Sequence, residues 1–300
     1  MLFRFGLPWI ALCCLAVLTI TALPAPGADG AEMEVEAESQ VMTNIGVEDG
    51  DDANFTSVTN EFSAGVSYPV WEGEVALELS YTLDSVSWNN PGDLPFGNGD
   101  DPWNTLHAWD LGLNYTHNID DAWSLIFGVS GSSAYEIETA NSFGISGHAG
   151  VSYVLDGEWI FVAGVSVSHD ALGTDVMPFG MITWMSPDMP GLVAVVGLPE
   201  TSLTVPLTET ISIKGYGELG GSTHRLSDDS SVAAKGYVSQ MHLDTGIDLI
   251  WEPLDNLAVT LGGAYRPWGK MELYDSDGDD INDYNTEGGW GGKLGVEISF

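Results

Sequence analysis

Four aspartates in one acidic segment have a spacing that could bind a metal ion. Asp275, Asp277 and Asp279 occupy alternate positions and Asp283 follows, so the segment reads DSDGDDIND. Calcium prefers six to eight hard oxygen ligands, and a curled backbone with this spacing can point several carboxylates at one centre. Gly278 would accommodate the curl. The spacing therefore predicts a candidate calcium site, and we expect no other cofactor. The alternative is a solvated acidic loop.

The same segment resembles the calcium loops of EF-hand-like and type 3 thrombospondin-like repeats, which read DxDxDxxxD. It departs from the EF-hand at Asp280, where the usual glycine would stand. The resemblance implies extracellular-type binding, with dissociation constants of roughly 10⁻⁴–10⁻³ M. Without calcium, mutual repulsion of the aspartates predicts an extended, mobile loop.

A second set of carboxylates lies along segments in which polar and apolar residues alternate. Glu78, Asp110, Asp244 and Asp248 all occupy the polar positions of such segments. Carboxylates that face a pore raise the local concentration of cations and repel anions. If the segments close into a barrel, we expect these four acids to line its lumen.

The acidic N-terminal part, 29–54, contains a candidate first strand and a loop. Glutamate stands at every second residue in it, at Glu32, Glu34, Glu36 and Glu38. As a strand, this stretch would place four carboxylates on one face. As a disordered lead, it would have no structural role. No flanking residue fixes the register, so both alternatives stay open.

Catalytic chemistry has little support in the sequence. The six histidines stand singly, with no GxSxG or HExxH context, at His107, His117, His148, His169, His224 and His242. His148 and His242 occupy polar positions and could pair with a nearby serine or aspartate. Lone histidines in such places are most often structural, so we expect no enzyme and no catalytic residues.

The amino-acid composition and net charge limit which binding partners the chain can have. The 300 residues include 44 Asp and Glu against 7 Lys and Arg, a formal net charge of −37 at pH 7. Nucleic acid and anionic membrane surfaces are therefore excluded as electrostatic partners, because neutralising phosphates requires Lys and Arg. A hydrophobic content of 44% with 10% aromatic residues also excludes a disordered chain.

The first segment, 1–28, has the layout of a secretory signal peptide. A positive charge precedes an apolar run, and small residues around 27–31 suit cleavage. The alternative is an uncleaved anchor, but the run is short of the ~20 residues that a helical span requires. Cys13 and Cys14, the two cysteines of the chain, lie in this run, and Leu12 before them disfavours lipidation. A cleaved chain would therefore have no disulfide or thiolate site.

Period-two alternation runs through most of the remaining chain. Apolar residues take every second position in 75–84, 108–116, 241–252 and 290–300. Runs this long suit a tilted membrane-spanning strand, which needs about 9–11 residues, whereas soluble strands average about 5–6. The polar faces are rich in Gly, Ser, Thr and acids, unlike a soluble surface that mixes both charge signs. The pattern predicts an all-β, antiparallel transmembrane β-barrel over 55–300.

Short and long connections alternate along the predicted barrel. Short turns are expected at 69–73, 118–121, 156–157, 186–191 and 252–256, and longer acidic loops at 46–54, 88–104, 135–141, 222–232 and 268–289. Outer-membrane barrels have short periplasmic turns and long outer loops. The count is 14 strands if 199–201 is an outer turn and 32–44 the first strand. It is 12 if 192–206 is one strand. Aromatic residues at strand ends, including Trp88 and Trp109, are expected to form interfacial girdles.

The C-terminal strand adds a further signal. Its alternating apolar residues end on Phe300, which resembles the sorting signature that the barrel-assembly machinery recognises in outer-membrane proteins. Segments 176–221 and 245–269, with their SPDMPG and AYRPWG turns, also resemble a family of uncharacterised outer-membrane β-barrel proteins classed as a domain of unknown function. The shared motifs are turn residues, so the resemblance implies the barrel and transfers no activity.

The leading hypothesis is an integral β-barrel in the outer membrane of a Gram-negative-type cell envelope. Its acidic lumen would pass small cationic or neutral solutes, as a porin-like channel with a weak preference for cations. The alternative is a closed structural or surface-display barrel with no transport. A barrel of 12–14 strands lies between filled and open barrels, so both stay open. The expected partners are outer-membrane lipid and the barrel-assembly machinery.

Overall fold

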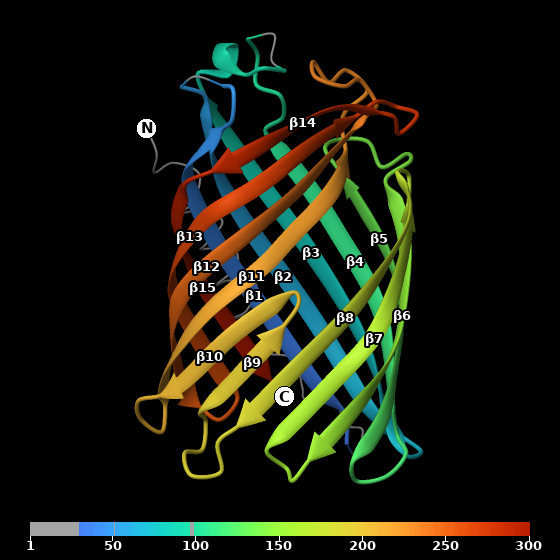
Figure 1. Ribbon diagram of the computed structural model, residues 1–300, viewed down its shortest axis with the longest axis vertical. Helices are drawn as coiled ribbons and strands as arrows, with labels where there is room; N and C mark the ends of the chain where they lie inside the picture. The colour runs from blue at the N-terminus through green and yellow to red at the C-terminus, as the bar shows by residue number, and fades with distance from the viewer. Residues whose placement is uncertain (1–29, 51, 97–98) are drawn as a thin grey trace.

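The computed structural model describes residues 30–50, 52–96 and 99–300. These residues form a closed, fourteen-stranded antiparallel β-barrel, which confirms the fold class expected from the alternation. Figure 1 shows the strands tilted around the barrel axis, with a short 3₁₀ helix, η1 (Pro91–Asp93), in a connection at one end. Among the described residues, no helix is long and apolar enough to cross a membrane. The predicted signal peptide, 1–28, lies outside the described residues.

Fifteen strand segments make up the wall, and consecutive segments from β1 to β14 pair antiparallel. They are β1 (Glu32–Val47), β2 (Asn54–Val70), β3 (Gly73–Asn89), β4 (Thr105–Asn118), β5 (Trp123–Tyr135), β6 (Phe143–Leu155), β7 (Trp159–Asp170), β8 (Gly173–Met185), β9 (Val193–Gly197), β10 (Glu200–Pro206), β11 (Ile211–Arg225), β12 (Tyr237–Leu254), β13 (Leu257–Tyr274), β14 (Asp280–Glu287) and β15 (Gly289–Ser299). The glutamate-rich segment is therefore a strand, and 192–206 contains two strands.

β14 and β15 share one position in the wall. β14 pairs with β13 over Gly269–Tyr274, whereas β15 pairs with β13 over Leu257–Arg266. Gly288, with a φ of 80°, separates the two segments. β15 also pairs with β1 over Glu34–Thr43, and this ladder closes the ring. The fifteen segments thus give fourteen positions, the larger of the two counts that the sequence allowed.

The two ends of the barrel differ. One end, here called the turn end, carries the connections after β2, β4, β6, β8, β10 and β12. The other, the loop end, carries the connections after β1, β3, β5, β7, β11 and β13, which include the two longest, 90–104 and 226–236. The loop-end connection after β7 is short, at 171–172. The connections expected to be long, near 46–54, 88–104, 135–141 and 222–232, all lie at the loop end, and 268–289 requires a correction.

That predicted long loop is mostly strand. β13 continues to Tyr274 and β14 begins at Asp280, so 275–279 alone forms the turn. The side chain of Asp275 accepts the backbone N–H groups of Asp277 and Asp279, at 2.9 and 3.0 Å, which turns the chain tightly. The sequence suggested a loop because acidic and other polar residues dominate 275–289. Backbone pairing holds the β-hairpin together, and Met271 and Leu273 on its β13 strand are buried, each 1% exposed.

The alternation places apolar side chains outside and polar ones inside. Leu77, Leu111 and Leu113 point outward and are 44–46% exposed. Their neighbours at the other parity, such as Thr82 and Ala108, line an interior cavity. The apolar residues thus form the outer surface of the wall, and the strand register agrees with the faces expected from sequence.

Aromatic side chains cluster near both ends of this outer surface. At the turn end, the ring centroids of Trp123 and Tyr153 lie 4.5 Å apart. Near the loop end, those of Tyr265 and Trp290 lie 4.3 Å apart. Trp109, at its expected place, contacts a neighbouring ring edge-to-face. Two aromatic girdles therefore border the apolar band.

An apolar cluster fills the loop end of the barrel interior. Trp88 is 7% exposed, and its indole N–H donates to the Trp103 carbonyl oxygen at 2.8 Å. We call the cluster the loop-end plug. It comprises Met42, Ile45, Val47, Ala53, Phe55, Val86, Trp88, Leu94, Trp103, Leu106, Leu226, Ala233, Val238, Ala264, Met271 and Leu273.

The loop-end plug corrects two expectations. Trp88 is a core residue and not part of a girdle, because its position on β3 faces inward with Val86. Two connections that were expected to be polar outer loops, after β3 and β11, also fold into the barrel. Leu94, Trp103 and Leu226 are at most 5% exposed there, because their apolar side chains gain more from this burial than from water.

We predict that Leu111→Lys destabilises the barrel by about 2–4 kcal/mol, because it places a charge on the apolar outer face. The matched control is Asn114→Lys, three residues along the same strand but on the inner face, where the change should be nearly neutral. Denaturant unfolding in lipid vesicles measures both. Equal destabilisation by the two substitutions would contradict the observed register.

Candidate functional site in the barrel lumen

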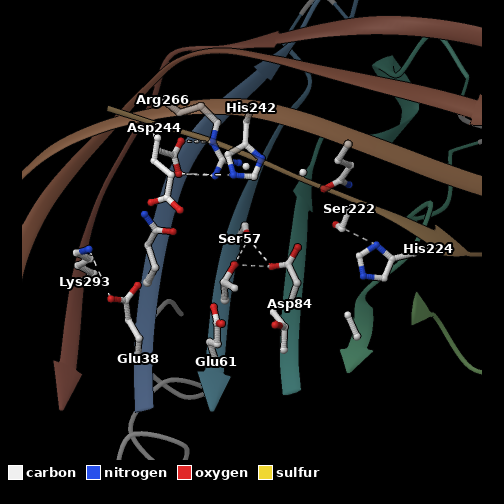
Figure 2. A pocket seen from close by; sticks show the side chains of 18 of the residues that line it. Glu38, Ser57, Glu61, Asp84, Ser222, His224, His242, Asp244, Arg266 and Lys293 are labelled. Atoms are coloured by element: carbon white, nitrogen blue, oxygen red, sulfur yellow. Dashed lines mark hydrogen bonds and ion pairs between the residues drawn. The ribbon is translucent and has the colours of Figure 1, made fainter. Parts of the chain in front are cut away.

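Below the loop-end plug, the barrel interior contains a polar cavity of about 280 Å³. Its walls come from β1 to β4 on one side and from β11, β12, β13 and β15 on the other (Figure 2). The lining side chains occupy the polar positions of alternating strands, so strand periodicity alone brings them into one space. We call this space the lumen cavity.

Arg266 on β13 holds Asp244 on β12 in a two-pronged ion pair. Its Nε lies 2.7 Å from Oδ1, and its Nη2 lies 2.8 Å from Oδ2. A register shift between Leu243 and Thr245 inserts a β-bulge at this point, and bulges redirect side chains. His242 Nε2 lies 3.8 Å from the same carboxylate. Arg266 and Asp244 are 12% and 8% exposed, so the pair is a fixed part of the wall.

Lys293 on β15 connects three further strands. Its Nζ lies 3.0 Å from Asp248 Oδ2 on β12 and 3.5 Å from Glu38 Oε2 on β1. The same Nζ lies 4.6 Å from the centre of the Tyr216 ring on β11, within the range of a cation–π interaction. Gly262 on the intervening strand β13 permits the approach, because a Cβ there would collide with the Asp248 carboxylate.

Three further acids, from both sides of the lumen cavity, have no base as a partner in the ion pairs described above. Glu61 on β2, Asp84 on β3 and Glu218 on β11 all face it. Asp84 accepts hydrogen bonds from the hydroxyls of Ser57 and Thr59, the latter at 3.2 Å. These hydroxyls stabilise the carboxylate without neutralising it.

The formal charge of the cavity lining follows from its ionisable residues. Two bases, Arg266 and Lys293, oppose five acids, so the sum is 2 − 5 = −3 with neutral histidines. The five acids are Glu38, Glu61, Asp84, Glu218 and Asp244. The ionisable lining of the lumen cavity therefore carries a negative formal charge.

The four acids expected in the lumen all lie on inward-facing positions, but they do not meet in one site. Asp244 and Asp248 are buried and ion-paired, as described above. Glu78 lines a separate cavity of about 250 Å³ near the turn end. Asp110 pairs in register with Ser80 and Ser132 on the neighbouring strands.

The four aspartates of the candidate calcium site are not brought together. Asp275 uses its side chain to cap the turn, and the carboxylate of Asp283 lies 3.1 Å from Lys270 Nζ on β13. Within 30–50, 52–96 and 99–300, no cluster of three or more His, Cys, Asp or Glu residues could hold a metal ion. The calcium site therefore stays a prediction. In the arrangement described here, the four aspartates do not converge on one centre.

Sequence reasoning missed the bases inside the barrel. Lys214, Arg266 and Lys293 all face the interior, and Lys214 Nζ lies 2.9 Å from Glu200 Oε1. The sequence did contain a signal, because Lys293 occupies a polar position of the last strand and the polar positions face the interior. In a chain with so few bases, a base at an inward position should have been expected to pair with acids on neighbouring strands.

Comparisons with known proteins give only distant likenesses. No family model matches the chain, and no curated protein matches it, so the resemblance to an uncharacterised family stays a prediction. Among solved structures, the COG4313 outer membrane channel from Pseudomonas putida F1 is 11% identical, with 93% of this chain and 97% of that chain covered and a TM-score of 0.48.

Two other solved structures show lower structural similarity. The translocator domain of the autotransporter NalP from Neisseria meningitidis is 11% identical over the whole of both chains, with a TM-score of 0.37. The P. putida toluene transporter TodX is 10% identical, with 91% of each chain covered and a TM-score of 0.39.

We predict that Arg266→Met lowers the free energy of unfolding by about 3 kcal/mol, because it leaves Asp244 buried without its partner. Adding Asp244→Asn should recover much of the loss. Denaturant unfolding of the single and double variants measures this coupling. Lys235→Gln removes a charge from an exposed loop residue and serves as the control. A loss from Arg266→Met no larger than that of the control would show that the ion pair is not structural.

Proposed function

We propose that this protein is an outer-membrane β-barrel whose lumen takes up small neutral or cationic solutes. The observation that carries the proposal is the inverted polarity of the closed wall, with apolar residues outside and ionised residues inside. A soluble barrel would reverse this arrangement. In hydrocarbon every backbone polar group must be paired within the protein, and a closed barrel meets this requirement with strands.

The outer surface has the extent that a bilayer requires. Large apolar side chains that are 36% exposed or more occur on all fifteen strand segments, from β1 to β15. Exposed apolar patches on soluble monomers rarely exceed a few hundred Å². A band that encircles the barrel and is bordered by aromatic girdles supports a membrane location, with lipid as the partner of this surface.

The acidic interior supports a channel with a preference for cations. The lining of the lumen cavity sums to −3, and carboxylates along a pore repel anions. The proposal gives the lumen residues no catalytic role. The loop-end plug obstructs the axial path, so it acts as the gate that controls passage along the axis.

The same loop-end plug favours a second candidate function, a closed structural or surface-display barrel. Trp103, Leu106 and Leu226 are at most 1% exposed, as in a protein core. A barrel sealed in this way could present its loops without transport. Conductance separates the two functions.

We predict that the protein unfolds only on heating and therefore migrates differently on gels before and after boiling, because the closed ladder resists detergent at room temperature. Heat-modifiable migration and a β-dominated circular dichroism spectrum in detergent check this. A chain that remains soluble and monomeric without detergent would refute the membrane location.

We also predict that shortening the connection between β3 and β4, by replacing 91–103 with a short Gly-Ser linker, increases single-channel conductance in planar bilayers. Cations should pass in preference to anions, more strongly at low salt, where the Debye length is about 30 Å at 0.01 M. Glu61→Gln with Glu218→Gln should weaken that preference, whereas Asp229→Asn in an exposed loop should not. Unchanged conductance after shortening would favour the structural barrel.

A further inference from the structure

The wall is incomplete between β8 and β11. β9 and β10 form a short hairpin that ends partway along the barrel (Figure 1). β8 therefore pairs with β9 over Met181–Met185 only, and β11 pairs with β10 over Ser212–Glu218 only. Within the described part of the chain, Gly173–Phe179 of β8 and Gly220–His224 of β11 have no ladder partner on the facing edges. We call this gap the side window.

The side window is closed at both ends. Toward the turn end, the Leu198 N–H donates to the Gly180 oxygen at 3.3 Å, and the Leu219 N–H donates to the Pro199 oxygen at 2.9 Å. Toward the loop end, Arg225 of β11 pairs with Tyr135 of β5. The gap is therefore a bounded opening and not a frayed edge.

Salt bridges reinforce the loop-end border. Arg225 donates to Glu138 in the β5–β6 connection at 3.1 Å and to Asp228 in the β11–β12 connection. The guanidinium lowers the pKa of Asp228 through this hydrogen bond. The Ser227 N–H also donates to Glu136 at 2.8 Å. The border is thus a fixed bridge between two connections.

A proline marks the β8 edge of the side window. The Met185 N–H donates toward β7, and Gly180 accepts on the opposite side, toward β9. Because successive residues alternate, Pro178 faces the same side as Gly180, so the residue without an N–H lies on the unpaired edge. An added strand would lack a donor there. The edge is therefore suited to remain unpaired, which argues against a peptide or a second copy as its occupant.

Side chains at the opening show that it leads into the lumen. Met177 shares an inward face with Ser166, its register partner on β7, yet it is 63% exposed. On the opposite rim, the lumen cavity extends to Gly220, Gly221 and Ser222. The interior therefore reaches the edge of the wall on this side.

The outer approach to the side window is apolar. Val165 and Val167 on β7 pair with Pro178 and Val176 on β8, and these valines are 44–64% exposed. An outer groove of about 500 Å³, lined by aromatic and aliphatic side chains, begins at Trp123 and ends at Gly180 and Val196, at the lower corner of the window. The rim therefore lies within the apolar band of the wall.

We propose that the side window admits amphipathic molecules, with an apolar tail and a neutral or cationic head, between the bilayer and the lumen cavity. This inference rests on the membrane location proposed above. Unpaired backbone groups are costly in hydrocarbon, and a polar head group or lumen water satisfies them. The charge of −3 selects against anionic amphiphiles, and the loop-end plug makes the side route independent of the axial one.

The test closes the side window reversibly. Met177→Cys and Ser222→Cys lie on opposite rims, in a background with Cys13→Ser and Cys14→Ser, and a reducible bifunctional methanethiosulfonate reagent bridges them. The probe is an alkylamine that carries a photoreactive diazirine in its chain, dissolved in the vesicle bilayer. Mass spectrometry assigns adducts to residues. Ser130→Cys with Ser146→Cys, whose hydroxyls are 2.9 Å apart across an intact ladder, is the matched control pair.

Labelling of lumen residues such as Glu61 and Glu218 should be lost on bridging the window, should return after reduction, and should be unchanged by bridging the control pair. A diazirine fatty acid should label outward residues only. Lumen labelling that persists after bridging would overturn the side route, and equal lumen labelling by the fatty acid would overturn the ligand class. Cross-links between two copies would mean that a second copy covers the window. Absence of labelling at Leu111 would contradict the membrane location itself.

Discussion

Pairing between the first and last strands of the described chain is the constraint on which the remaining structure depends. In hydrocarbon an unpaired amide costs several kcal/mol, so a sheet must have no free edges. The ladder between β1 and β15 provides this closure. Once it is fixed, strand periodicity assigns every other side chain to the inside or the outside. The side window is the place where the described ladder is incomplete, and a polar interior lies directly behind it.

Electrostatics divide the barrel into two unlike sectors. Lys293 and Arg266 join β1, β11, β12, β13 and β15 through contacts that cross strands, and the loop-end plug fills the space above them. The facing sector, β5 to β8, has an inner face of small residues such as Ser130, Gly164 and Ser166. It has few side chains long enough to reach across the lumen. The side window lies between β8, in the sector with small inner residues, and β11, in the ion-paired sector. Few side chains there are long enough to link the two edges of the wall.

The sequence predicted the elements that obey period two and missed those that depend on three-dimensional register. The faces of β3 and β4 followed directly from alternation, and Asp244 and Asp248 of β12 lie on the inner face of the wall. Trp88 was misassigned because an aromatic residue at a strand end fits a girdle and a core equally well. Its contact with Trp103, in the neighbouring connection, shows that it belongs to the core. The partners of Lys293 lie on strands that are not adjacent in sequence, so their meeting depends on strand tilt. The hairpin with its turn at 275–279 was missed because acidic and other polar residues dominate its turn and its second strand, β14.

Closure between β1 and β15 also sets the order in which the chain can assemble. Thr43 donates to the carbonyl of Trp290, 247 residues away, so the ring cannot be completed until nearly the whole described chain has been synthesised. Contacts of such sequence separation form slowly, and unclosed sheet edges aggregate in the meantime. A net charge of −37 makes unfolded copies repel one another during that interval. The acidic residues that determine the charge of the lumen in the finished barrel thus also keep the chain soluble before the barrel closes.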